Sequence, residues 1–110
     1  NIQRERERAL RAPMVVLAIA CLDPKQSKVP ILEQQLAAGC ATLQFMQAVI
    51  SCGYGAVWLS GDRIYQPALT SRLKLGEDEQ LIGLINIGTV QSPATSKQRS
   101  AARVRYWHSK

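Results

Sequence analysis

The stretch Gly53-Tyr54-Gly55-Ala56-Val57-Trp58-Leu59-Ser60-Gly61 lies where a long apolar segment of this 110-residue chain ends and a short strand begins. Gly53 suits the position just after a helix, because the backbone there needs a positive φ that glycine adopts without strain. Residues 54–59 are predicted to form a strand, and Ser60-Gly61-Asp62 a turn. The stretch therefore predicts a helix-to-strand connection and sets the arrangement of the elements around it.

The segment before this stretch, residues 31–52, predicts one long helix. Pro30 suits its first turn, and Gly39 is the one strong helix breaker inside it. A helix of about 22 residues is roughly 33 Å long. Because it is apolar on most sides, we expect it to be covered on most sides, which in so small a domain requires a partner subunit. Glutamines within it argue against a lipid bilayer as the cover: Gln34, Gln35, Gln44 and Gln47.

Two further apolar runs predict strands. Residues 14–22 follow the pair Ala12-Pro13, which stops a helix, and their unbroken apolar character fits a strand buried on both faces. Residues 80–87 fit a third strand that ends at Gly88. The chain therefore supplies three strands for a small sheet.

The order of the predicted elements indicates an α+β fold. Residues 2–11 pair Arg with Glu at helical spacing and predict an exposed helix. Residues 65–73 predict a short helix, and residues 77–79 a solvated acidic loop. Helices and strands thus alternate along the chain, which suits a three-layer α/β/α sandwich with a small mixed sheet and a long central helix.

The net charge of +6 lies at the ends of the chain. Residues 13–96 carry five basic and six acidic residues, whereas residues 97–110 carry five basic residues and no acidic one. A nucleic-acid-binding fold more often spreads Lys and Arg along one face of the folded body. We therefore expect a single domain over residues 1–110, with an extended, solvated basic tail over residues 90–110 rather than a nucleic-acid-binding arm.

No common catalytic or metal-binding pattern is found in the sequence. The one histidine, His108, stands in the terminal tail, where a packed Ser-His-Asp site rarely forms. Cys21, Cys40 and Cys52 lie in apolar runs without metal-ligand spacing, which predicts reduced, buried thiols in a cytoplasmic protein. No catalytic side chain and no metal ligand is assigned. If the protein is an enzyme, a cofactor is expected to do the chemistry.

Five short motifs follow one another along the chain: Arg11-Ala12-Pro13; Val29-Pro30 with Glu33; Leu36-Ala37-Ala38-Gly39-Cys40-Ala41; residues 53–61; and Leu84-Ile85-Asn86-Ile87-Gly88-Thr89. Together they resemble the C-terminal half of the FMN-dependent nitroreductase family, in particular its small bacterial members, over roughly residues 9–99. The resemblance implies a partial nitroreductase-like sandwich and a homodimer with the helix 31–52 at its core. It also implies FMN and NAD(P)H as cofactors and the reduction of nitroaromatic or quinone-like acceptors.

The same resemblance implies two groups of cofactor-binding residues. Residues matching Trp58, Leu59, Ser60 and Gly61 run beside the flavin ring in the family, and the amide of Ser60 or Gly61 is the candidate donor to flavin N5. Small residues there let the main chain approach a flat ring. Lys97 and Arg99 would contact the FMN phosphate or ribityl chain. The alternative interpretations are a turn that needs Ser and Gly only for its shape, and a solvated basic tail.

Two departures from the family pattern stand out. Leu59 occupies a position where small members often carry Arg. The family's N-terminal segment, with its Arg-rich, Ser-containing stretch for the FMN phosphate, is absent, so the chain is expected to be a fragment. Two alternative functions therefore stay open: a truncated nitroreductase-like protein without full activity, and a small basic nucleic-acid-binding module acting through residues 97–110.

Overall fold

The computed structural model describes residue 3 and residues 12–108. The predicted order of elements is confirmed from residue 12 onward, whereas the helix predicted over residues 2–11 lies, apart from residue 3, outside the described residues. The helix predicted over residues 65–73 is confirmed as a helix over residues 67–72, which begins at Pro67 because Gln66 is extended (ψ 133°), and a separate 3₁₀ helix precedes it. The elements are β1 (Met14–Cys21), α2 (Ile31–Ser51), β2 (Gly55–Leu59), the 3₁₀ helix η1 (Asp62–Tyr65), α3 (Pro67–Arg72) and β3 (Glu79–Gly88).

The last strand, β3, is the centre of a three-stranded sheet with the order β1-β3-β2. Met14 of β1 lies opposite Ile87, and Gly55 of β2 lies opposite Gly88, so both pairings are antiparallel. A bulge between Ala18 and Ile19 shifts the register of β1. The small sheet is confirmed, but its described pairings are all antiparallel where a mixed sheet was expected. The reason is that α2 carries the chain from β1 to a parallel β2, and β3 then inserts between them.

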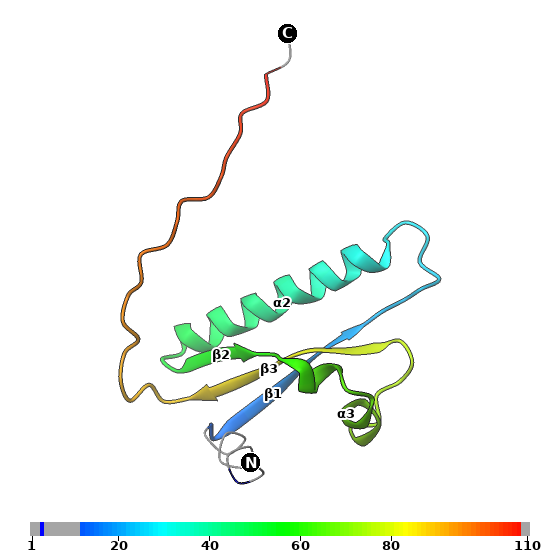
Figure 1. Cartoon of the computed structure of the whole chain (residues 1–110), viewed down its shortest axis with the longest axis horizontal. Helices are drawn as coiled ribbons and strands as arrows, with labels where there is room; N and C mark the ends of the chain where they lie inside the picture. The colour runs from blue at the N-terminus through cyan, green and yellow to red at the C-terminus, as the bar shows by residue number, and fades with distance from the viewer. Residues whose placement is uncertain (1–2, 4–11, 109–110) are drawn as a thin grey trace.

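Helical segments cover both faces of this sheet (Figure 1). One face carries Val16 and the fully buried Ile85, which lie against α2. The opposite face carries Leu84 and Asn86, which line a cavity together with residues of η1 and α3. Among the described residues, the buried hydrophobic core is small and consists of Ala20, Ile64, Leu81 and Ile85. The predicted α+β class and its three layers are thus confirmed.

The long helix α2 is covered by its own chain on one side only. Thr42 is the one buried residue of α2, and it lies on the side that faces the sheet. Leu36 and Leu43 are 60% and 51% exposed, although both are apolar. The described residues of one chain therefore do not supply the cover that is predicted for most sides of this helix. Among the described residues, no helix combines the length and the apolar character needed to cross a membrane.

Two burial predictions are wrong for the single chain. Cys21, Cys40 and Cys52 are free, as expected, but all three are exposed rather than buried. The strand β1 is not buried on both faces either, and its Met14 is 57% exposed. The physical reason is the same for both. In the part of the chain that the structure describes, β1 is an edge strand and α2 is covered on one side, so both elements carry more apolar residues than this part of the chain can bury.

The chain beyond β3 leaves the body as an extended tail (Figure 1). Residues 89–108 contain no helix or strand, and Tyr106 and Trp107 are 83% and 93% exposed. The radius of gyration is 17.7 Å, larger than the roughly 13 Å of a compact domain of similar length. That residues 1–110 form a single domain stays a prediction.

Candidate functional site

A cavity of about 790 Å³ lies between the sheet and the segment formed by η1 and α3. We call it the η1–α3 cavity. Its volume is within the range of small-molecule sites. Its floor comes from all three strands, with Val15 of β1, Leu59 of β2, and Leu84 and Asn86 of β3. Its other wall comes from the helical segment and from the turn before it: Ser60, Arg63, Ile64, Gln66, Ala68, Leu69 and Arg72.

The register of the sheet explains which side chains line this cavity. Leu59 lies opposite Leu84 in the β2–β3 pairing, and directly paired residues point to the same face. Alternate residues of β3 point to opposite faces, so Asn86 joins Leu84 while Ile85 points to α2. Ile64 is only 3% exposed and anchors η1 on the sheet. The cavity is therefore held by strand pairing on one side and by a buried anchor on the other.

The predicted flavin segment, residues 58–61, is divided between the two faces of the sheet. Leu59 and Ser60 line the η1–α3 cavity. Trp58 points to the opposite face, where its indole nitrogen donates a hydrogen bond to the carbonyl of Ile82 at 3.3 Å. Trp58 is thus a packing residue beside the cavity and does not line it.

The turn that follows Leu59 presents backbone donors. Within the described residues, no hydrogen bond takes the amide N–H of Ser60 or of Gly61 as its donor, while the Gly61 carbonyl accepts from the amide of Ile64 at 3.2 Å. Gly61 has a φ of 117°, and a Cβ built on it would meet no atom within 4 Å. Two exposed, unpaired amides on small residues, next to an apolar cavity, suit the edge of a flat ring that carries acceptor atoms.

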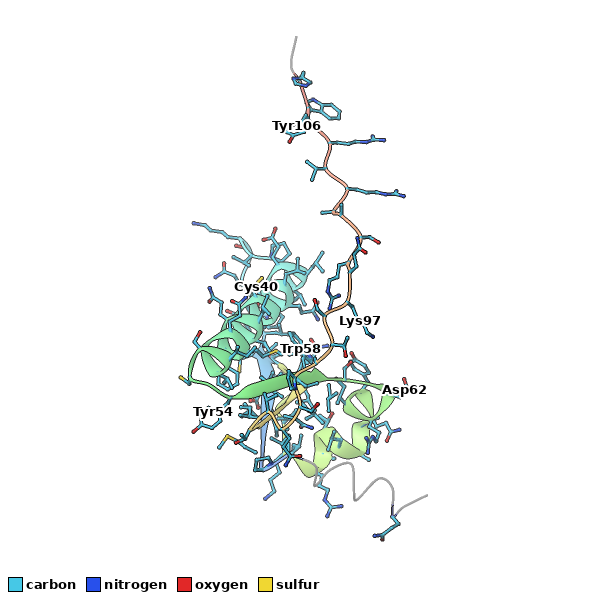
Figure 2. All side chains as sticks on the ribbon, turned by 90° about the vertical axis from the view of Figure 1, so that its left-hand side faces the viewer. Cys40, Tyr54, Trp58, Asp62, Lys97 and Tyr106 are labelled. Carbon is cyan, nitrogen blue, oxygen red and sulfur yellow. The ribbon has the colours of Figure 1, made fainter. Side chains whose placement is uncertain are left out.

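Lys97 and Arg99 do not meet the rest of the predicted site in this structure. Both are exposed on a segment without helix or strand, and neither lines the η1–α3 cavity. Figure 2 shows the tail rising from the body, with Lys97 on its lower part and Tyr106 near its far end. His108 is also exposed on this tail. Of the six predicted site residues, the structure therefore places Leu59 and Ser60 on the η1–α3 cavity.

Sequence reasoning missed the polar side chains of the helical wall. Arg63 of η1 and Arg72 of α3 line the cavity, as does Gln66 between them. These side chains are exposed and follow no hydrophobic period, so no sequence signal could have found them. Predicting the charged lining needs the path of the chain after Gly61, which no local pattern provides. In the part of the chain that the structure describes, no group of three or more His, Cys, Asp or Glu residues could hold a metal ion.

Comparisons with known proteins point in one direction. No protein-family model matches the chain. It is 40% identical over 91 residues to a Haemophilus influenzae protein named "Putative NAD(P)H nitroreductase", which covers 83% of this chain and 50% of that protein. It is 30% identical over 95 residues to "Putative NAD(P)H nitroreductase YdjA" of Escherichia coli, which covers 86% of this chain and 51% of that protein.

A solved structure agrees with these relatives. The crystal structure of the nitroreductase-like family protein from Bacillus cereus matches with a TM-score of 0.74 and 25% sequence identity. The match covers 90% of this chain and 52% of that chain. The chain therefore spans about half the length of the relatives that it matches.

Proposed function

We propose that the chain is part of an FMN-dependent oxidoreductase. It is a nitroreductase-like protein over the half that it shares with its relatives, and this half is consistent with their C-terminal portion. In this proposal the electron donor is NAD(P)H, and the acceptor is a nitroaromatic or quinone-like molecule. The observation that supports it best is the pair of unpaired amides at Ser60 and Gly61 beside the η1–α3 cavity.

The residues of the chain would bind and orient the cofactor rather than transfer protons. FMN, when bound, supplies the hydride chemistry between NAD(P)H and the acceptor. The amide of Ser60 or Gly61 would donate a hydrogen bond to the ring at N5, and Leu59 and Leu84 would exclude water from its surroundings. Lys97 and Arg99 would hold the phosphate or ribityl chain by charge-assisted hydrogen bonds.

The exposed side of α2 supports a homodimer as the assembled form. Leu36, Cys40, Leu43, Gln47 and Ile50 follow one another at spacings of four and three residues, the pattern of a seam between two helices. All five are exposed in the single chain, and none is charged. A second copy packed along this seam would cover the apolar surface that the chain leaves open. The free thiols of Cys21, Cys40 and Cys52 support a reducing, cytoplasmic compartment.

Titration of the purified protein with FMN tests this proposal. Binding is expected to quench flavin fluorescence. Without oxygen, the complex is expected to oxidise NADH or NADPH over many turnovers only when a nitro compound such as nitrofurazone is added as the electron acceptor. Protein that stays colourless, takes up no FMN and oxidises neither donor would contradict the enzyme and favour a truncated relative without activity. Reduction of the nitro compound no faster in the presence of the protein than with free FMN alone would also contradict the enzyme.

A further inference from the structure

The electrostatic character of the η1–α3 cavity points to a class of acceptor. Among the described residues that line it, two are cationic, Arg63 and Arg72, and none is acidic. The other polar residues on the lining, Ser60, Gln66 and Asn86, are neutral. Resting on the function proposed above, we propose that this cavity selects aromatic acceptors that carry a carboxylate, with Arg72 as the residue that binds it.

Arg72 is placed to act as an anion-binding group. It is the last residue of α3 and exposes its side chain at the rim of the cavity. Within the described residues, its guanidinium has no hydrogen-bond or ion-pair partner. A guanidinium is planar and binds a carboxylate through two parallel hydrogen bonds, so an unpaired one beside an open cavity favours a planar anion.

The rest of the cavity suits the aromatic part of such a ligand. Val15, Leu59 and Leu84 form an apolar floor, and Ala68 and Leu69 an apolar wall. Apolar surface of this kind stabilises a flat ring by removing it from water. Asp62, the acidic residue of η1, does not line the cavity. The cavity therefore combines an apolar body with a cationic rim.

Two ligands of nearly equal shape separate this charge effect from simple apolar binding. Calorimetry on the purified protein would compare 4-nitrobenzoate, which is an anion at pH 7, with 4-nitrobenzamide, which is neutral. We expect the benzoate to bind about tenfold more tightly, as one charge-assisted hydrogen-bond pair at a partly exposed site allows. Raising the ionic strength should reduce this preference, because salt screens exposed charges.

Matched variants assign the effect to its residue. Arg72→Gln is expected to remove the preference for the benzoate and leave the affinity for the benzamide unchanged. Arg103→Gln removes the same charge from the tail, far from the cavity lining, and should leave the preference intact. Equal binding of both ligands, binding of neither, or equal effects of the two variants would overturn the inference. Binding of neither is the expected result if another polypeptide segment fills the cavity.

Kinetics then separate this inference from the proposed function. If the protein reduces both nitro compounds with equal kcat/KM, the flavin enzyme stands and the carboxylate selection fails. If it reduces neither but calorimetry shows the tenfold preference lost in Arg72→Gln, the carboxylate site stands and the flavin proposal fails. A preference in kcat/KM that Arg72→Gln removes through KM, with kcat unchanged, supports both.

Discussion

The indole ring of Trp58 occupies the space that a Cβ on Gly83 would need, so the two residues of adjacent strands β2 and β3 fit only because one is glycine. On its other side the ring reaches α2, where it lies 3.9 Å from the position of a Cβ built on Gly39. Trp58 thus lies between two glycines and connects helix to sheet. It does so immediately before the turn at Ser60 and Gly61, whose position it helps to determine.

Substituting Gly83 should therefore be costly. Gly83→Ala places a methyl group where the indole lies, which forces the ring or the strand to move and should lower the free energy of unfolding by about 1–3 kcal/mol. Gly39→Ala is the matched control: its methyl group would make an ordinary contact with the same ring, and alanine favours the helix by up to about 1 kcal/mol. Urea unfolding of both variants measures the difference. Equal stabilities would show that Trp58 does not constrain Gly83.

Much of this fold could be predicted from the sequence, because its longest elements carry strong local signals. Pro30 and Gly53 bound α2 within one or two residues, and Gly53 has the positive φ expected of it, 92°. The face to which Trp58 points could not be predicted, because it depends on the register with β3, which involves distant residues. The lining of the cavity by Arg72 escaped prediction for the same reason.

The loop between β1 and α2 offers a second prediction. The Gln34 side chain accepts a hydrogen bond from the amide of Asp23 at 2.7 Å and donates to the carbonyls of Asp23 and Val29 at 2.9 and 2.8 Å. Gln34→Ala removes all three and should cost about 1–2 kcal/mol in the free energy of unfolding. Gln44→Ala, on the same helix, should change it by less than about 0.5 kcal/mol. Thermal or urea unfolding compares them, and similar losses would contradict a specific role for Gln34.

The effect of Gly61 on FMN binding can be separated from the general loss of stability that follows when a glycine is replaced. Gly61 and Gly53 both have positive φ, 117° and 92°, so alanine at either should destabilise the chain by about 1–2 kcal/mol. Only Gly61→Ala adds a methyl group beside the proposed flavin edge, and it should weaken FMN binding about tenfold. Fluorescence titration with FMN measures this effect. A loss of affinity shared equally by Gly53→Ala would indicate a general effect of stability.

The proposed dimer seam predicts that a charge placed within it halves the molecular mass of the protein in solution. Leu43→Asp introduces a charge at the centre of the seam and should convert a dimer into monomers, as light scattering after gel filtration would show. Gln44→Asp, beside the seam, is the control and should leave the dimer intact. The Cys40 thiol should react more slowly than Cys21 and Cys52 in the dimer, although all three are exposed in one chain. A monomeric unsubstituted protein at micromolar concentration would contradict the seam.

The central position of β3 has a consequence for the order in which this chain can acquire its structure during synthesis. Among the described residues, both β1 and β2 pair only with β3, which follows them in the chain and leaves the ribosome after them. Until Gly88 has emerged, the apolar β1 has no strand to pair with, and contacts between segments so far apart form slowly. The nascent chain thus carries an unpaired apolar strand until β3 has emerged, and such a state is prone to aggregation.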